Sequence, residues 1–275
     1  MIDAPQQFAD QLWHGEVDVS DGIVPILMAG EGPPLILLHG WTLDWRMWLP
    51  QVDELGRDFL LVIPDRRGFG RSTAPPDLTK EAEDVERIAD FLGFERYSLL
   101  GLSQGAAVAL DCAHRNGWRI GSLVVSGAPI PSLVQRDEVI DLDRYEALAR
   151  AGNMDTMRAD WSRHELMSHE NPATSALVDR ILADYQGRDL LAPSSLRGVP
   201  RDALAHLPMP LLAMTGARDS QWRRECAQAL ADISPRGSYA LVESAGHLAN
   251  LDNPESFNRT VMDFLLRCDA ATRRA

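Results

Sequence analysis

Short runs of apolar residues recur along the chain, and most of them are bounded by Gly, Pro or Asp. Runs of this kind, rich in Val, Ile and Leu, are typical of strands that are buried on both faces of a sheet. We therefore expect six strands, at residues 34–38, 59–63, 97–102, 122–125, 210–215 and 239–242.

Stretches with the apolar spacing of a helix separate most of these runs. Four such helices are expected, at residues 78–92, 105–115, 221–231 and 254–267. Strands that alternate with helices form a mainly parallel sheet with helices on both faces. The pattern therefore predicts an α/β fold.

One long segment breaks this alternation. Residues 131–207 carry no strand-like run and instead predict short helices, at residues 143–151, 154–167 and 173–185. They are either peripheral crossover helices or a lid over a pocket, and their place between two core strands favours the lid. We therefore expect a core domain of residues 1–130 and 208–275 and a helical cap (lid) of residues 131–207.

Composition and charge limit the possible partners. Of the 275 residues, 45% are hydrophobic and 24% are charged, as in an ordinary folded protein, and the formal net charge of −13 argues against binding to nucleic acid. The three cysteines form no C-x-x-C pair, and no apolar run is long enough to span a membrane. Residues 1–13 do not resemble a signal peptide. We expect a cytoplasmic protein with no nucleic-acid or membrane partner and no metal; the oligomeric state stays open.

The strongest chemical motif is a G-x-S-x-G sequence with Ser103 at its centre. A predicted strand precedes it and a small-residue helix follows, which places the serine on a sharp bend at the edge of the sheet. Gly101 and Gly105 leave room for the helix to pack closely on the strand. Ser103 is therefore the candidate nucleophile.

A serine hydroxyl needs a base, and the base needs a carboxylate that fixes its tautomer. Asp219 and His247 both follow predicted strands, so both should emerge at the same edge as Ser103. Glu243 and Asp252 are rival acids close to His247 in sequence, but neither has the strand-end position. Surface or packing roles are expected for the other histidines outside the oxyanion loop, which are His14, His114, His164, His169 and His206.

Negative charge on the attacked carbonyl oxygen requires preorganised donors. The backbone N–H of Gln104, at the start of the helix, is one candidate, and that of Trp41, in the loop after the first predicted strand, is the other. His39 is interpreted as a residue that braces this loop. Trp41, Trp161 and His164 are candidate residues of the substrate pocket, although core packing is the alternative for the tryptophans.

These motifs together resemble those of the α/β-hydrolase superfamily, from residue 15 onward. The resemblance rests on Leu38-His39-Gly40-Trp41, Asp65-Arg66-Arg67-Gly68-Phe69-Gly70-Arg71-Ser72, Gly101-Leu102-Ser103-Gln104-Gly105, Gly216-Ala217-Arg218-Asp219 and Gly246-His247. It implies a Ser-His-Asp hydrolase with a helical cap inserted after the sixth strand, without a cofactor, in which residues 65–72 form a structural turn. Within the superfamily the chain is similar to the esterase and lactonase branch, including enol-lactonases and small carboxylesterases.

The expected reaction is hydrolysis of a small-molecule carboxylic ester or lactone through an acyl-enzyme on Ser103. The same triad could also serve carbon-carbon bond hydrolysis, perhydrolysis or acyl transfer to an alcohol. A hydrolase-fold receptor that binds a small molecule is a third interpretation, of a different class. The sequence alone does not separate these possibilities, and it does not identify the acyl group or the leaving group.

Overall fold

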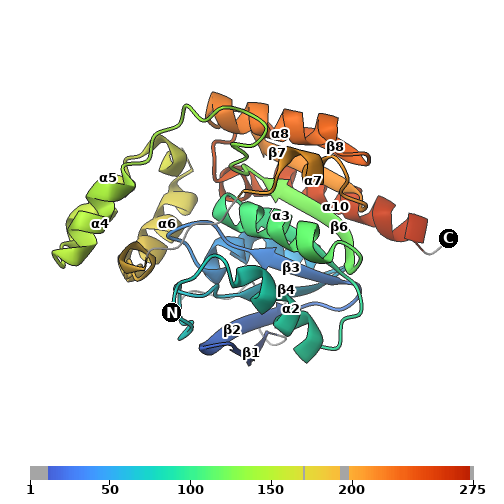
Figure 1. The fold of residues 1–275 in the computed structure, drawn as a ribbon, viewed down its shortest axis with the longest axis horizontal. Helices are drawn as coiled ribbons and strands as arrows, with labels where there is room; N and C mark the ends of the chain where they lie inside the picture. The colour runs from blue at the N-terminus through green and yellow to red at the C-terminus, as the bar shows by residue number, and fades with distance from the viewer. Residues whose placement is uncertain (1–11, 170, 193–197, 273–275) are drawn as a thin grey trace.

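A single sheet of eight strands forms the centre of the molecule (Figure 1). The computed structural model describes residues 12–169, 171–192 and 198–272. The strands lie in the order β1-β2-β4-β3-β5-β6-β7-β8, and all neighbours from β4 to β8 are parallel. Their bounds are β1 Trp13–Val19, β2 Gly22–Ala29, β3 Pro34–Leu38, β4 Leu60–Pro64, β5 Tyr97–Leu102, β6 Ile120–Ser126, β7 Leu211–Gly216 and β8 Gly237–Val242.

The inner strands are apolar because both of their faces are covered. In β3, Leu35 and Leu37 belong to one apolar cluster, while Ile36 and Leu38 belong to the other. Successive side chains of a strand point to opposite faces, so a strand that is buried on both sides must be apolar at every position. This is why the short apolar runs predicted the parallel strands.

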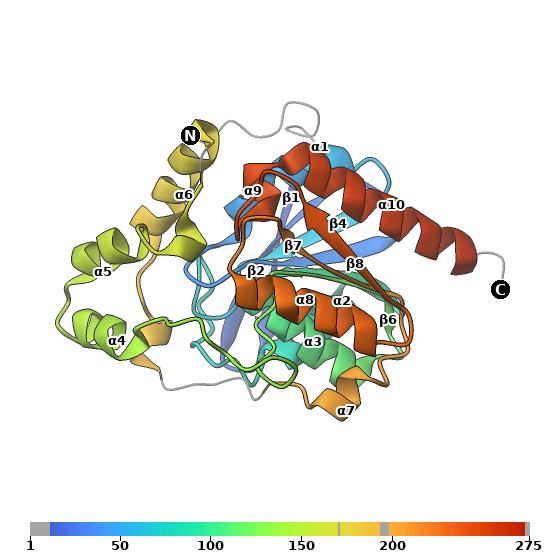
Figure 2. The same ribbon diagram turned by 90° about the horizontal axis from the view of Figure 1, so that it is seen from above.

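Helices cover the two faces in two groups. Figure 2 shows α2, α3 and α8 on one side of the sheet and α1, α9 and α10 on the other. The apolar clusters agree with this division. The bounds of these helices are α1 Leu49–Leu55, α2 Glu81–Phe91, α3 Gln104–Asn116, α8 Gln221–Ile233, α9 Ala249–Asp252 and α10 Pro254–Thr272. The predicted mainly parallel α/β architecture is confirmed.

Two strands had not been predicted. β1 and β2 pair in antiparallel fashion, with Val17 opposite Val24, and β2 pairs in the same way with β4. In β1 the residues from Glu16 to Val19 alternate between polar and apolar, which is the signal of a strand with one solvated face. A search for continuous apolar runs overlooks that signal.

Helical segments fill the chain between β6 and β7; the first three α-helices gather at one end of the sheet, and the helix Arg201–Leu204 lies apart from them (Figures 1 and 2). They are α4 Leu142–Arg150, α5 Met154–Trp161, α6 Pro172–Asp184 and α7 Arg201–Leu204. The single helix predicted over residues 154–167 is wrong, because α5 ends at Trp161 and a short 3-10 helix, η2 (Glu165–Met167), follows it. Residues 170 and 193–197 of the predicted cap, and residues 1–11 of the predicted core, lie outside the described residues.

The inserted helices share a core with one face of the sheet. Tyr145, Met157, Trp161 and Val178 are buried in the same apolar cluster as α1 and α10. Burial of these apolar side chains holds the insertion against the core. The insertion is therefore packed onto the sheet edge as well as tethered at its two ends.

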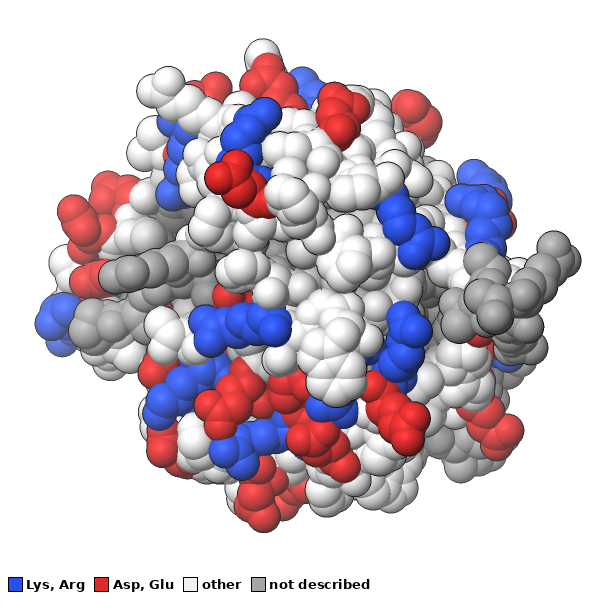
Figure 3. All heavy atoms as spheres, turned by 45° about the vertical axis from the view of Figure 1, so that its right-hand side comes forward, with Lys and Arg blue, Asp and Glu red and all other residues white. Residues whose placement is uncertain are grey.

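The molecular surface carries charges of both signs. On the face shown in Figure 3, Lys and Arg side chains are interspersed with Asp and Glu, without a continuous basic patch. Within the described ranges, no helix combines the length and the apolar character that crossing a membrane requires.

Candidate active site

Ser103 lies on a strained turn between β5 and α3. Its backbone has φ 55° and ψ −116°, which is a costly conformation for a residue with a side chain. The flanking glycines make this turn possible. A Cβ on Gly101 would lie 2.4 Å from the carbonyl oxygen of Gly105, and a Cβ on Gly105 would lie 2.2 Å from that of Leu38. The turn presents the serine side chain to a cavity beyond the strand end.

Asp219 and His247 meet at the same edge of the sheet. Asp219 follows β7 and His247 follows β8, and the Nδ1 atom of His247 lies 2.9 Å from Oδ2 of Asp219. Both side chains are buried, with 0% of the Asp219 side chain and 4% of the His247 side chain exposed. The rival acids are engaged elsewhere or point away: Asp252 accepts a hydrogen bond from the N–H of Gly246, and Glu243 is exposed.

Gly127 presses against this pair from the end of β6. Its φ is +58°, and a Cβ there would lie 2.8 Å from Cε1 of His247 and 3.2 Å from Oδ2 of Asp219. A side chain at residue 127 would therefore displace the imidazole. The glycine fixes the position of the ring by close backbone contact.

The carboxyl group of Asp219 is kept ionised. Burial opposes its ionisation, but the charge and hydrogen bond of His247 outweigh burial, together with the hydroxyl of Thr215 and the charge of Arg223. As a result, the pKa of Asp219 lies below its ordinary value. The hydroxyl of Thr215 and the backbone N–H of Ser220 both donate to the carboxylate. An ionised Asp219 accepts the Nδ1 hydrogen of His247 and leaves Nε2 free to act as a base.

A buried ion pair that the sequence analysis missed supports this region. Arg223 of α8 donates two hydrogen bonds to Glu138, at 2.8 Å from Nε and 2.7 Å from Nη2, and a third to the carbonyl oxygen of Gly127. The pair connects the start of the insertion to the backbone beside His247. No sequence signal identified it, because a single Arg on a helix normally indicates a solvated face.

The loop that follows β3 is braced by His39, as predicted. The imidazole is fully buried; its Nε2 accepts from the N–H of Arg66, so Nδ1 carries the hydrogen and donates to the carbonyl oxygen of Gly40. Burial and the charge of Arg66 hold the pKa of His39 well below its usual range. The ring is therefore a neutral structural group.

Arg66 connects three parts of the site. Its guanidinium donates twice to Glu81, once to the carbonyl oxygen of His39 and once to the side-chain oxygen of Gln104. Arg66 thus connects the loops of the site from within the segment of residues 65–72. The sequence analysis did not identify this role of its side chain. The backbone N–H of Gln104 is the first of α3, so it has no partner within the helix and lies at the positive end of the helix dipole.

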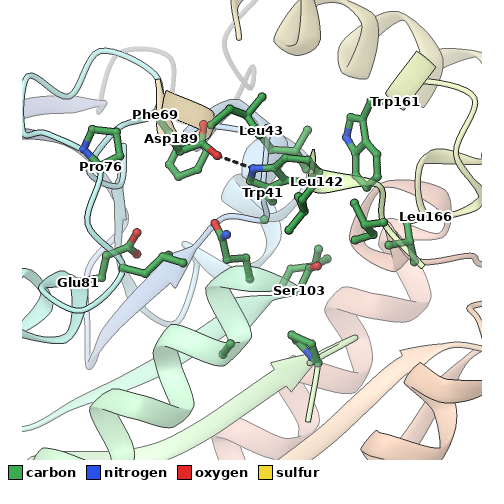
Figure 4. Close-up of a pocket in the computed structure, with 18 of the residues that line it drawn as sticks. Trp41, Leu43, Phe69, Pro76, Glu81, Ser103, Leu142, Trp161, Leu166 and Asp189 are labelled. Atoms are coloured by element: carbon green, nitrogen blue, oxygen red, sulfur yellow. Dashed lines mark hydrogen bonds between the residues drawn. The ribbon is translucent and has the colours of Figure 1, made fainter. Parts of the chain in front are cut away.

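A cavity of about 410 Å³ opens next to Ser103. Gln104, Trp41 and His247 line it together with the serine, and most of the remaining wall is apolar. Figure 4 shows Ser103 on the floor, with Trp41, Trp161 and Leu166 above it. The apolar part of the wall includes Leu43, Phe69, Leu102, Ile140, Leu142, Leu166, Met167 and Leu190.

Two tryptophans connect the insertion to the loop after β3. The indole N–H of Trp41 donates to Asp189 at 2.6 Å, and that of Trp161 donates to the hydroxyl of Thr42 at 2.9 Å. The two rings lie edge to face, with centroids 4.7 Å apart. Both predicted tryptophans therefore line the cavity. Asp189 also accepts from the hydroxyl of Tyr185, and its burial raises the pKa of its carboxyl group above the ordinary value.

His164 is placed differently from the prediction. Its ring packs on Trp161, with centroids 4.7 Å apart, and its Nδ1 accepts from the N–H of Leu166 at the start of η2. His164 is not among the described residues that line the cavity. Its contacts indicate a packing and capping role within the insertion.

The arrangement places three groups at one sheet edge: the Ser103 hydroxyl on its strained turn, the imidazole of His247 and the carboxylate of Asp219. Trp41 and Gln104, whose backbone N–H groups are the candidate donors, line the same cavity. A search of the described residues found no group of three or more His, Cys, Asp or Glu side chains that could hold a metal ion. The side chains present are those of nucleophilic acyl transfer.

Known proteins that resemble this chain include putative carbamate hydrolases as well as esterases. Residues 35–260 match the alpha/beta hydrolase family. The chain is 26% identical to a pimeloyl-[acyl-carrier protein] methyl ester esterase of Aeromonas hydrophila, over 86% of this chain and 96% of that protein. Among solved structures, it resembles the enol-lactonase from Burkholderia xenovorans LB400, with a TM-score of 0.77, 22% identity and coverage of 92% of this chain and 100% of that one. It also resembles the carboxylesterase CesB from Bacillus subtilis, with a TM-score of 0.75, 23% identity and coverage of 93% and 92%.

Proposed function

Because the chain belongs to the alpha/beta hydrolase family, we propose that it is a serine hydrolase that cleaves a carboxylic ester or lactone of a small molecule. The observation that carries the proposal is the buried contact of 2.9 Å between Asp219 and His247, beside the strained turn that bears Ser103. A carboxylate, an imidazole and a serine hydroxyl in this order are the groups of acyl transfer through a covalent intermediate.

The first half of the reaction forms an acyl-enzyme. His247 takes the proton of the Ser103 hydroxyl at Nε2, and the oxygen attacks the carbonyl carbon of the substrate. The carbonyl oxygen becomes negatively charged and accepts hydrogen bonds from the backbone N–H groups of Trp41 and Gln104. When the C–O bond breaks, His247 returns the proton to the departing alkoxide. Asp219 stabilises the charged imidazole between these two transfers.

The second half releases the acyl group. A water molecule gives a proton to His247 and attacks the ester carbon, and the same donors hold the new oxyanion. Collapse of this intermediate breaks the bond to Ser103, whose oxygen takes the proton back from His247. The products are an alcohol and a carboxylic acid, which for a lactone are one molecule.

The inserted helices act as a lid in this proposal. Trp161, Leu166 and Met167 line the cavity, and Trp161 and Leu166 lie across it from Ser103 (Figure 4). An apolar wall excludes water and strengthens the electrostatic interactions at the reacting carbonyl. The composition of this wall favours a substrate with an uncharged, largely apolar acyl group.

Substitution of the serine tests the function directly. In Ser103→Ala we expect kcat on p-nitrophenyl butyrate to fall by at least about 10⁴-fold, because the nucleophile is removed. The matched control is Ser238→Ala, which changes an exposed serine on β8. A fluorophosphonate should label the parent and the control at Ser103 and leave Ser103→Ala unlabelled. Equal hydrolysis by Ser103→Ala and the parent would refute the mechanism.

Product analysis decides between hydrolysis and related chemistry. With an ester as substrate, water as the acceptor gives the free acid, whereas an alcohol acceptor gives a new ester and peroxide gives a peracid. We expect the free acid to be the main product under steady turnover. Labelling of Ser103 without multiple turnovers on any ester or lactone would instead favour a receptor.

A further inference from the structure

The side-chain amide of Gln104 has a fixed orientation. An arginine guanidinium carries only donors, so the atom of Gln104 that faces Arg66 must be the amide oxygen. Oε1 accepts from Nη2 of Arg66 at 2.9 Å. The amide nitrogen therefore points away from Arg66, and its two hydrogens make no hydrogen bond to the described residues.

The side chain of Arg66 is itself held in a fixed position. Its side chain is 3% exposed and donates to both oxygens of Glu81, at 2.6 and 2.9 Å. A third bond, of 2.7 Å, runs to the carbonyl oxygen of His39. A side chain held by this many charge-assisted bonds has little freedom to rotate. Gln104 is thus oriented by a group that is itself locked in place.

Gln104 lines the cavity beside Ser103. Other polar side chains of the wall already have partners: Asp189 accepts from Trp41 and Tyr185, and Arg67 donates to Asp84. An oriented amide N–H without a protein partner, in a mostly apolar cavity, requires an acceptor from the ligand or from water.

The order of the strands indicates which part of the substrate this amide faces. Arg66 follows β4 and His247 follows β8, and these strands lie on opposite sides of β5, which carries Ser103. In the proposed reaction His247 donates a proton to the leaving group, so the leaving group lies on the side of β8. The acyl group then extends toward Gln104.

The charges on this side of the cavity limit the ligand further. The carboxyl groups of Glu81 and Asp189 both line the cavity, and Arg66 is close enough to Asp189 for its charge to act on that carboxyl. Arg67, paired with Asp84, also lines this side, so three carboxyl groups face two guanidiniums and a further negative charge is disfavoured there. The acceptor should therefore be an uncharged oxygen.

We propose that Gln104 is a specificity-determining residue that selects acyl groups with a neutral acceptor oxygen, such as an ether or a ketone, next to the reacting carbonyl. This inference rests on the proposed function, since it assigns the acyl side of the same site. It requires the side chain of Gln104, whereas the oxyanion contact requires only its backbone.

A pair of isosteric substrates tests the proposal. p-Nitrophenyl methoxyacetate and p-nitrophenyl butyrate differ by an ether oxygen in place of a CH₂ group. In Gln104→Glu, which keeps an oxygen for Arg66 and loses the N–H donors, the ratio of kcat/KM for methoxyacetate to butyrate should fall roughly 5- to 10-fold from its value in the parent. Gln104→Leu should show the same fall. The intrinsic reactivity of the two esters cancels in this comparison.

Two results would overturn the proposal. One is an unchanged ratio in both variants; the other is a fall in Gln104→Leu alone, which would mean that the effect comes from the freed Arg66. Thermal unfolding of each variant checks that the fold is intact. A conservative control, Gln228→Glu, changes an exposed glutamine of α8 and should leave the ratio as in the parent.

A binding measurement separates this inference from the proposed function. In the Ser103→Ala background, ligand-observed NMR titrations of methyl methoxyacetate and methyl butyrate require no turnover. The preference for methoxyacetate should shrink by the same factor when Gln104→Glu is added. If that preference is found and the parent shows no turnover, the proposed function fails, and what remains is that Gln104 recognises the ether oxygen. If the parent turns over esters and the preference is absent, the inference fails alone.

Discussion

The two sides of the cavity are held together by different kinds of contact. On the sheet side, Asp219 and His247 follow strand ends, Gly127 contacts the imidazole closely, and Arg223 of α8 donates to the carbonyl oxygen of Gly127. On the insertion side, aromatic rings are held by single hydrogen bonds, such as that of Trp41 with Asp189. The Asp219 carboxylate accepts hydrogen bonds from three groups, whereas each of the two indoles at the insertion donates one hydrogen bond.

This difference matches what each side has to do. Acyl transfer needs the same geometry for every substrate, so precise placement is an advantage on the sheet side. The insertion side contributes apolar side chains to the cavity wall, away from the acid and the base. Substitutions on the two sides should therefore produce effects of different kinds as well as different sizes.

Among the substitutions that compare the two sides, the largest effect is expected at the acid. In Asp219→Asn the imidazole loses the partner that fixes its tautomer, so kcat should fall by about 10³- to 10⁴-fold while the fold is retained. Steady-state hydrolysis of p-nitrophenyl butyrate measures the loss, and circular dichroism checks the fold. The controls are the rival acids: Glu243→Gln and Asp252→Asn should stay within a few-fold of the parent. A comparable loss in either control would assign the acid to that residue.

Next in size is the loss of stability when the buried ion pair is broken. Glu138→Leu leaves Arg223 charged and unpaired in a buried position, which should lower the free energy of unfolding by about 3–5 kcal/mol. Adding Arg223→Leu removes the buried guanidinium charge that has lost its partner, and it should restore part of the free energy of unfolding. Urea unfolding measures both. The effect of Arg223→Leu on the free energy of unfolding is compared in the parent and in Glu138→Leu. If Arg223→Leu destabilised both proteins by the same amount, the two residues would not be coupled.

The same pair should make stability depend on pH. Burial opposes the ionisation of Glu138, but the hydrogen bonds and charge of Arg223 outweigh it, so the pKa of Glu138 lies below its ordinary value. The folded state therefore releases this proton more readily than the unfolded chain. The resulting stability is present above the unfolded pKa and is lost as the pH falls through the folded pKa. In Glu138→Gln the fall in unfolding free energy at acidic pH should be less steep.

The two sides also differ in how far the sequence could predict them. The parallel strands were predicted within two residues at each end, because burial on both faces imposes a continuous apolar run. Because Asp219 and His247 both follow predicted parallel strands, the sequence also predicted that they lie at the same edge of the sheet. The hairpin of β1 and β2 was missed because its alternating pattern lacks such a run.

The contacts of the insertion could not be predicted in this way. Trp41 and Asp189 are 148 positions apart, and Arg223 and Glu138 are 85 apart. Nothing in the local pattern distinguishes a charged residue that meets a distant partner from one that faces water. His164 illustrates the limit, since its position in the insertion suggested the pocket and its contacts instead cap a short helix. Pairings of this kind depend on how the helices pack onto the sheet.

A moderate effect is expected at the contact between the insertion and the loop after β3. In Asp189→Ala the indole of Trp41 and the hydroxyl of Tyr185 both lose their acceptor, so the cavity wall should loosen and kcat/KM should fall by about 10-fold. Tyr185→Phe keeps the bond to Trp41 and should have a smaller effect. Tryptophan fluorescence should report the change around Trp41. A variant with lower stability but an unchanged kcat/KM would show that this contact serves the fold alone.

The smallest effect is expected at the edge of the same contact, where Arg46 pairs with Asp184 at 2.7 Å. The Asp184 side chain is 67% exposed, so solvent screens the attraction, and Arg46 keeps its second partner, Asp44, when Asp184 is removed. Asp184→Ala should therefore change the free energy of unfolding by roughly 0–1 kcal/mol and leave kcat/KM unaltered. A double-mutant cycle with Arg46→Ala, measured by urea unfolding at low and high salt, isolates the pair. A coupling energy well above this range would mean that the insertion is held to the core by charge, and the contrast between the two sides of the cavity would then rest on the tryptophan contacts alone.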